Sequence, residues 1–163
     1  MNVETGHTIL KECSMMKSYS QRDGRWANIR IGDSSLTIGR FGCVITCIAD
    51  LSTYFGDNLL PNEVANIHEF TTDGQILWNT GNYGHMVFSR REYGRHNDRI
   101  LHAIKHPDLA VILQVANKSH WVVAINAKEG IDNLGIADPW LGDKTTMKRY
   151  NNNITGAAYF LLK

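Results

Sequence analysis

Residues 38–51 read Ile38-Gly39-Arg40-Phe41-Gly42-Cys43-Val44-Ile45-Thr46-Cys47-Ile48-Ala49-Asp50-Leu51. After the glycine and the cysteine, apolar residues recur at helical spacing, which predicts a helix over Gly42–Tyr54 that stops at Gly56. A thiol at a helix N-terminus lies beside free backbone N–H groups and the positive end of the helix dipole, and both favour the thiolate. Because a thiolate is a nucleophile, we predict that chemistry takes place at Cys43.

The composition is that of an ordinary globular domain. The chain has 163 residues and a formal net charge of +1. That length predicts one domain over residues 1–163, with 1–17 as a lead-in segment. The charge gives no electrostatic case for a nucleic-acid partner. No apolar run reaches the roughly 20 residues of a membrane helix, and the N-terminus has no signal-peptide core. We therefore expect synthesis in the cytoplasm and, by default, a monomer.

The remaining pattern predicts helices first and strands afterwards. Helices are expected from Pro61 and over Asn97–Lys105. Before the cysteine, Ser18–Asp23 is expected to be extended and Trp26–Ser35 to be a loop. This order is typical of an α+β fold in which N-terminal helices pack on a C-terminal antiparallel sheet. The predicted strands of that sheet are Leu109–Val115, His120–Ile125, Leu134–Asp138 and Ala157–Leu162.

A cysteine nucleophile needs a base, a group that orients the base, and a donor for the oxyanion. His120 opens a predicted strand and Asp138 ends the next one, so antiparallel pairing would place them side by side. Asp138 could then accept the Nδ1–H of the imidazole and hold the useful tautomer. The amide of Gln21 could donate to an oxyanion, together with the backbone N–H of Cys43.

Each of these residues has a simpler structural explanation when it is taken alone. A cysteine at the start of a helix is usually a small buried apolar residue. A histidine that opens a strand is usually a surface residue, and Asp-Pro at a strand end is common in turns. The prediction therefore depends on the combination and its chain order: Gln21, Cys43, His120 and Asp138.

That order resembles a known family. The match spans roughly residues 18–142 and is to the double-glycine (bacteriocin-leader-processing) peptidase-like family of papain-like cysteine peptidases. The later motifs are similar to the family's histidine and aspartate strands. The residues that carry the resemblance are Tyr19-Ser20-Gln21-Arg22-Asp23-Gly24-Arg25-Trp26, Gly32, Thr37-Ile38, Gly42-Cys43-Val44-Ile45-Thr46, Ser119-His120-Trp121-Val122-Val123-Ala124 and Ala137-Asp138-Pro139-Trp140-Leu141-Gly142.

The resemblance implies a papain-like α+β fold and peptide-bond hydrolysis through a thioester. It implies that Cys43 is the nucleophile, His120 the base and then the acid, Asp138 the orienting residue and Gln21 the oxyanion donor. It gives no cofactor and no metal. The sequence departs from the family at Val44, because many relatives have glycine or another small residue after the cysteine.

The expected substrate follows from how members of the resembled family are organised. Leader-processing members are usually fused to a membrane transporter, whereas single-domain members of this length occur among phage and bacterial cell-wall hydrolases. We therefore expect a peptidoglycan-peptide hydrolase of the endolysin type, which reaches the wall after holin-dependent release. The alternatives are a peptidase that cleaves leader peptides after Gly-Gly and a non-enzymatic peptide-binding module of the same fold.

Two other classes are disfavoured by residue counts. Zinc could be held by Cys43, Cys47 and His120, but no second Cys/His pair accompanies them. An NlpC-type relative would generally use a second histidine as its third residue, and no histidine follows His120. The odd number of cysteines, with Cys13 as the third, excludes a framework of paired disulfides. Cys47 is interpreted as a structural core residue.

The cleft walls are predicted less directly. The segment Ser89–His96 is interpreted as a solvated loop, with a basic rim for an anionic wall polymer as the alternative. All four tryptophans could line a groove. Trp78 is the best candidate for a wall, with packing in the core as an equal alternative, and Trp121 is expected to pack beneath the site.

Overall fold

A computed structural model describes residues 16–163, which form four α-helices and a six-stranded antiparallel sheet. The sheet has the strand order β1-β6-β2-β3-β4-β5. The expected lead-in over 1–17 lies almost wholly outside the described residues. The elements are α2 (Ile38–Phe41), α3 (Cys43–Tyr54), α4 (Pro61–Ile67), β1 (Met86–Tyr93), α5 (Asn97–Lys105), β2 (Leu109–Val115), β3 (His120–Asn126), β4 (Gly135–Asp138), β5 (Asp143–Thr146) and β6 (Gly156–Leu162), with short 3-10 turns at Trp78–Thr80, Ile131–Asn133 and Met147–Tyr150.

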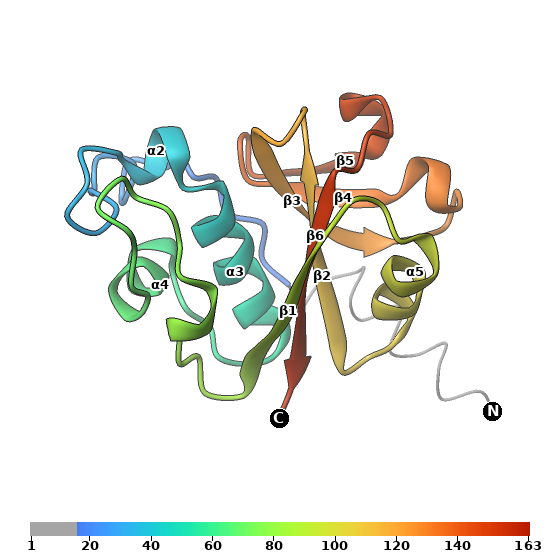
Figure 1. Cartoon of the computed structure of the whole chain (residues 1–163), viewed down its shortest axis with the longest axis horizontal. Coiled ribbons are helices and arrows are strands. Elements are labelled where there is room, and N and C mark those ends of the chain that lie inside the picture. Colours follow the sequence, from blue (N-terminus) through green and yellow to red (C-terminus); the bar gives the residue numbers. More distant parts are fainter. Residues whose placement is uncertain (1–15) are drawn as a thin grey trace.

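Helices cover both faces of the sheet. Helix α3 packs on β3, and α5 packs on β2 and β3. Figure 1 shows α2, α3 and α4 together to one side of the strands and α5 on the other. Because side chains alternate between the two faces of a strand, β2 and β3 supply residues to both helical layers and read as nearly continuous apolar runs.

Two apolar cores follow from this arrangement. The core under α3 contains Ile48, Ile112 and Trp121, whereas the core under α5 contains Ile104 and Val122. These residues are at most 7% exposed. The first core fixes the start of α3 against β3, and this is where the candidate site lies.

The predicted helices and central strands are confirmed. Helix α3 starts one residue after the predicted Gly42, and α5 covers the predicted Asn97–Lys105. Strand β2 matches its predicted range, and β3, β4 and β6 differ from theirs by one residue at an end. The general architecture of helices on an antiparallel sheet is therefore the expected one.

The two edge strands of the sheet were not expected. Most of Ser89–His96, interpreted as a solvated loop, belongs to β1, and β5 was not predicted at all. Both strands have only one neighbour, so one edge stays open to solvent and their sequences are polar. A register shift between Phe88 and Arg90 further breaks the alternation of β1. Consequently β1 lies between α4 and α5, and the helices do not all precede the strands.

The segment Ser18–Asp23, expected to be extended, contains a turn at Gln21 and Arg22 and is otherwise irregular. The Tyr19 N–H donates to Asp50 Oδ1 at 2.8 Å, and the Gln21 N–H donates to Pro139 O at 2.7 Å. The segment therefore bridges α3 and the loop after β4. The expected loop at Trp26–Ser35 is confirmed.

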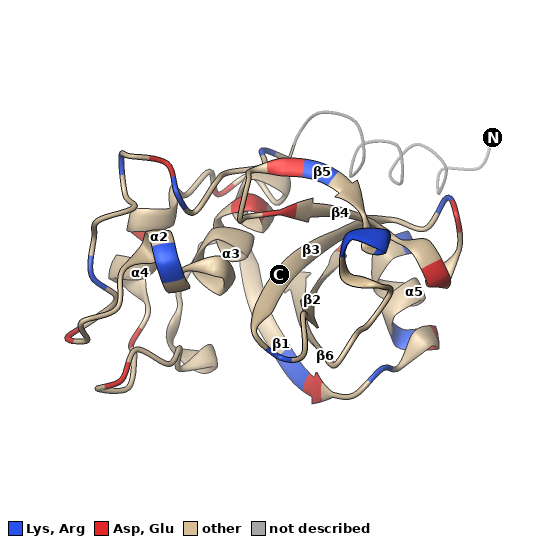
Figure 2. Cartoon of the chain, turned by 90° about the horizontal axis from the view of Figure 1, so that it is seen from above, with Lys and Arg blue, Asp and Glu red and all other residues tan. Residues whose placement is uncertain are grey.

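Charged residues of both signs are interspersed along the chain, as Figure 2 shows, in agreement with the net charge of +1. None of the helices among residues 16–163 combines the length and apolar content needed to cross a bilayer.

Candidate active site

Cys43 is the first residue of α3, as predicted. Helix α2 runs into α3 through Gly42, whose φ of −87° is not a left-handed turn. A Cβ atom at Gly42 would lie 2.6 Å from Ile38 O and 2.7 Å from Ile38 Cγ2, so only glycine fits the junction. The close approach of the two short helices therefore decides where α3 begins and holds Cys43 at its N-terminus.

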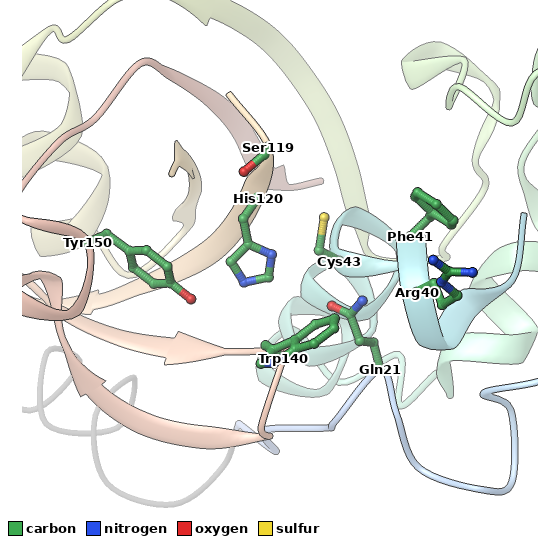
Figure 3. A pocket seen from close by; sticks show the side chains of 8 residues that line it. All are labelled: Gln21, Arg40, Phe41, Cys43, Ser119, His120, Trp140 and Tyr150. Carbon is green, nitrogen blue, oxygen red and sulfur yellow. The ribbon is translucent and has the colours of Figure 1, made fainter. Parts of the chain in front are cut away.

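His120 and Asp138 meet across neighbouring strands. Strands β3 and β4 pair antiparallel, and His120 Nε2 lies 2.8 Å from Asp138 Oδ1. The expectation that Nδ1 would face the carboxylate is wrong. Figure 3 shows the imidazole between Cys43 and Tyr150, with its other nitrogen on the side of Cys43. Because Nδ1 is the ring nitrogen nearer the main chain, it reaches the helix start while Nε2 extends to the next strand.

Asp138 is held as a carboxylate by four donors. Its Oδ1 accepts from His120 Nε2 and from the Trp140 N–H at 3.0 Å. Its Oδ2 accepts from Arg149 Nη1 at 3.0 Å and from the Tyr150 hydroxyl. Burial alone would raise the pKa of Asp138, but these hydrogen bonds hold it well below the usual range. The carboxylate is therefore ionised and fixed in orientation.

The pKa of His120 is shifted in the opposite direction, upward. Burial lowers the pKa of its imidazole, but hydrogen bonds to Asp138 and Cys43 outweigh burial and raise the pKa to about 9. The side chain is 12% exposed, and Asp138 is 1% exposed, so solvent screens this pair weakly. Near neutral pH the arrangement therefore favours an imidazolium between a carboxylate and a cysteine sulfur.

Gln21 lies at the same place, although the turn that carries it was not foreseen. Its side chain is 1% exposed, and its Nε2 donates to Gly39 O at 3.3 Å. An uninterrupted helix would pair this carbonyl with the Cys43 N–H. Within the described part of the chain, Gln21 Oε1 is buried without a hydrogen-bond partner. The amide therefore lies beside Cys43, and one of its two Nε2 hydrogens is left to donate to another acceptor.

A cavity of about 380 Å³ joins these side chains, and Figure 3 shows them around it. Three of the four predicted site residues line it, and the fourth, Asp138, lies behind His120. The structure therefore brings together Gln21, Cys43, His120 and Asp138, which are far apart in the sequence. The cavity is lined by Gln21, Arg40, Phe41, Cys43, Ser119, His120, Trp140 and Tyr150.

The tryptophans divide between wall and core. Trp140 lines this cavity, and Trp78 and Trp121 line a neighbouring one that Cys43 also lines. Trp78 both lines this second cavity and packs against the core under α3, so each of its two interpretations holds in part. Trp121 is largely buried at 7% exposure. Trp26 is 1% exposed and packs in the core, so the suggestion that it lines a groove is wrong.

Cys47 behaves as the expected core residue. It has no exposed surface, and its Sγ faces Trp121 O at 3.5 Å. Burial raises the pKa of its thiol, and the charge of Asp50 adds to this effect. A search of residues 16–163 finds no group of three or more His, Cys, Asp or Glu side chains placed to hold a metal ion. The third cysteine, Cys13, lies outside the described residues.

Two residues of the site were missed. Arg149 donates to Asp143 through Nη1 at 2.8 Å and Nη2 at 2.7 Å. Its Nη1 also donates to Asp138. Tyr150 follows it in a 3-10 turn and places its ring 5.6 Å from that of His120. Nothing in a lone Arg-Tyr pair after a polar segment predicts such contacts, because they depend on how β5 pairs with β4.

The sequence matches no protein-family model and no curated protein.

Proposed function

We propose that the protein is a papain-like cysteine peptidase. One observation carries the proposal: Cys43 at a helix start shares a cavity with His120, whose other ring nitrogen is bound by a buried carboxylate 2.8 Å away. A cysteine, an imidazole and an orienting acid in this order are the parts that thiol acyl transfer needs. The antiparallel sheet opposite α3 is also the arrangement that the resemblance implies.

In the acylation step, the Cys43 sulfur attacks the carbonyl carbon of the scissile peptide bond, and the carbonyl oxygen becomes an oxyanion. The backbone N–H of Cys43 and the remaining Nε2 hydrogen of Gln21 are the donors for that oxyanion. The imidazolium of His120 then gives its Nδ1 proton to the leaving amine. The C–N bond breaks, and the acyl group stays on sulfur as a thioester.

In the deacylation step, neutral His120 takes a proton from water, and the hydroxide attacks the thioester carbon. The C–S bond breaks, the carboxylic acid leaves, and the thiolate–imidazolium pair is restored. Asp138 accepts the Nε2–H throughout and does not itself take the proton. Its four donors favour this role, because they hold it ionised while His120 changes charge.

The substrate we propose is a peptide of peptidoglycan, as in endolysins, and this narrower part of the proposal rests on the sequence resemblance. A leader peptide ending in Gly-Gly is the second candidate from the same family. A peptide-binding module without turnover is disfavoured by the geometry, because a binding site alone has no need for an imidazole held between a thiol and a buried carboxylate.

The test is incubation with purified sacculi from several bacteria, followed by mass analysis of the soluble fragments. The wild-type protein is expected to release fragments with new amino termini, and Cys43→Ala is expected to release none. Cys47→Ala is the matched control, because it removes a thiol that has no exposed surface. Cleavage of synthetic Gly-Gly leader peptides with intact sacculi would favour the leader-processing function. Equal product from wild type and Cys43→Ala would overturn the peptidase assignment.

A further inference from the structure

A second cavity of about 420 Å³ adjoins the catalytic one. Both are lined by Phe41, Cys43 and Ser119, so the two cavities adjoin at the cysteine. A peptide whose scissile bond lies at Cys43 would extend through both. A side chain close to that bond would therefore enter the second cavity, which for brevity is called the side pocket.

The walls of the side pocket combine polar surface with apolar and aromatic surface, and Phe70, Trp78 and Trp121 supply the rings. Its lining includes two charged residues, Arg91 and Lys118, and both are cations. Asp73 is adjacent in sequence to the lining Gly74, but it accepts a hydrogen bond from the Thr71 hydroxyl. The lining therefore combines apolar surface with positive charge and contains no carboxylate.

Arg91 is held in place by rings rather than by an acid. Its guanidinium carbon lies 5.9, 4.5 and 5.4 Å from the ring centres of Trp78, Tyr93 and Trp121. Its Nη1 donates to the Tyr93 hydroxyl at 3.1 Å, while its Nε is buried without a hydrogen-bond partner among the described residues. The guanidinium is thus oriented in advance and has donor capacity left over.

The acid nearest to Arg91 along the chain is engaged elsewhere. Glu92 is the next residue of β1, and Arg90 and Arg99 pair with it. Neighbouring side chains of a strand point to opposite faces. Glu92 therefore points to the face that α5 covers, and Arg91 points to the face where Trp78 lies. Figure 2 shows this run of basic and then acidic residues on β1. The charge in the side pocket consequently has no ion-pair partner among residues 16–163 in the structure.

We propose that the side pocket selects a carboxylate-bearing side chain of the substrate, bound by Arg91 and assisted at the mouth by exposed Lys118. The methylene groups of a glutamate would contact the aromatic walls, and its carboxylate would take up the free donors of the guanidinium. Excluding water around this pair strengthens it relative to an ion pair on the open surface. This inference rests on the proposed peptidase function, and the test separates the two.

The first experiment measures cleavage. Internally quenched peptides with amidated C-termini are made in pairs that differ by Glu or Gln at one position, scanned along the peptide. At one position the Glu peptide is expected to have a kcat/KM at least tenfold above its Gln partner. In Arg91→Gln that ratio is expected to fall to about one, and in Lys118→Gln to fall about threefold. Arg90→Gln, which removes a charge from the opposite face of β1, is expected to keep the wild-type ratio.

The second experiment measures binding without turnover. Fluorescein-labelled pools of the same Glu and Gln peptides are titrated with Cys43→Ala, and anisotropy is recorded. The Glu pool is expected to bind about tenfold more tightly, and this preference is expected to vanish in the double variant Cys43→Ala/Arg91→Gln. Circular dichroism of each variant checks that the fold is retained.

The outcomes are distinct. A charge preference in binding that depends on Arg91, with no peptide cleaved, would support the side pocket and overturn the peptidase. Cleavage with equal rates for Glu and Gln at every position would support the peptidase and overturn the side pocket. If Cys43→Ala binds neither pool, or binds both alike, the proposed selectivity is wrong.

Discussion

His120 begins β3 and Asp138 ends the neighbouring antiparallel strand β4, and their 2.8 Å contact is the centre of a row of charged side chains that extends to Arg149 and Asp143. The row alternates in sign: imidazolium, carboxylate, guanidinium, carboxylate. Each charge in it therefore has an opposite neighbour. This alternation explains how Asp138 stays ionised at 1% exposure, where a lone carboxylate would take up a proton.

The titration of His120 is the first prediction. Its NMR signal, assigned by its loss in His120→Gln, should titrate near pH 9 rather than near 6.5. Because the folded pKa lies above the unfolded one, the stabilisation is fully present below pH 6.5 and is lost as pH rises through 9, by about 3 kcal/mol. Enzyme activity should also fall as the pH rises through 9. In Asp138→Asn the pKa should drop by at least one unit. A wild-type midpoint near 6.5 would contradict the ion pair.

Selective alkylation should separate the two described cysteines. Iodoacetamide should label Cys43, which lines the cavity, well before Cys47, which has no exposed surface and a raised thiol pKa. Peptide mapping by mass spectrometry of samples quenched over time measures both rates. Cys13 is also expected to react more slowly than Cys43. Labelling in denaturant is the control, where the rates should converge. Equal rates in the native protein would argue against an activated sulfur.

Tyr150→Phe tests how Asp138 is held. The change keeps the ring beside His120 and removes one of the four donors to the carboxylate. We expect kcat to fall about 10-fold with little change in KM. Three donors remain, so the loss should lie near the lower end of the roughly 1.5–3 kcal/mol that one hydrogen bond to a charged group contributes. Tyr54→Phe is the matched control, because its hydroxyl donates to Pro107 O away from the site. A similar loss of kcat in both variants would point to a general effect on stability.

Gln21→Ala tests the oxyanion donor. Loss of one such donor typically lowers kcat by about 10²-fold, and because the donor acts in the transition state, KM should change little. Gln21→Glu should be worse, because it places a carboxylate next to both Gly39 O and the developing negative charge. Steady-state kinetics of the folded variants give kcat and KM separately and so test both expectations. A rise in KM at unchanged kcat would instead assign Gln21 to ground-state binding.

Asp50 provides a prediction about stability. Burial raises the pKa of its carboxyl well above the usual value, against the opposing effect of the Tyr19 N–H. The folded state thus binds the proton more tightly, and the free energy of unfolding falls as pH rises above about 4. Asp50→Asn keeps an acceptor for Tyr19 and removes the buried charge, so Tm at pH 7 should rise by several degrees. A Tm unchanged or lowered at pH 7 would contradict this.

The control for that prediction is Asp132→Asn. Its side chain is 88% exposed, and its ion pair with Arg95 lies on the surface. Removing the same charge there should change Tm little at any pH. Differential scanning calorimetry from pH 4 to 8 compares the two variants, and only Asp50→Asn should flatten the pH dependence.

The sequence by itself determined which elements bury apolar surface and which residues carry side chains suited to catalysis. Helical spacing after Gly42 and the apolar runs of β2 and β3 are visible locally, because a helix or a buried strand imposes its period on the residues it covers. The polar edge strands β1 and β5 carry no such period, so they were missed. For the same reason Arg91 was interpreted as part of a solvated loop.

Only the tertiary structure decided which atoms meet. Which ring nitrogen of His120 faces Asp138, the support from Arg149 and Tyr150, and the place of Arg91 among three aromatic rings all depend on strand register and loop path. Register is set by the sum of many packing contacts across both cores, and no single residue records it. The chemical groups can thus be named from the chain, whereas their geometry is a property of the folded sheet.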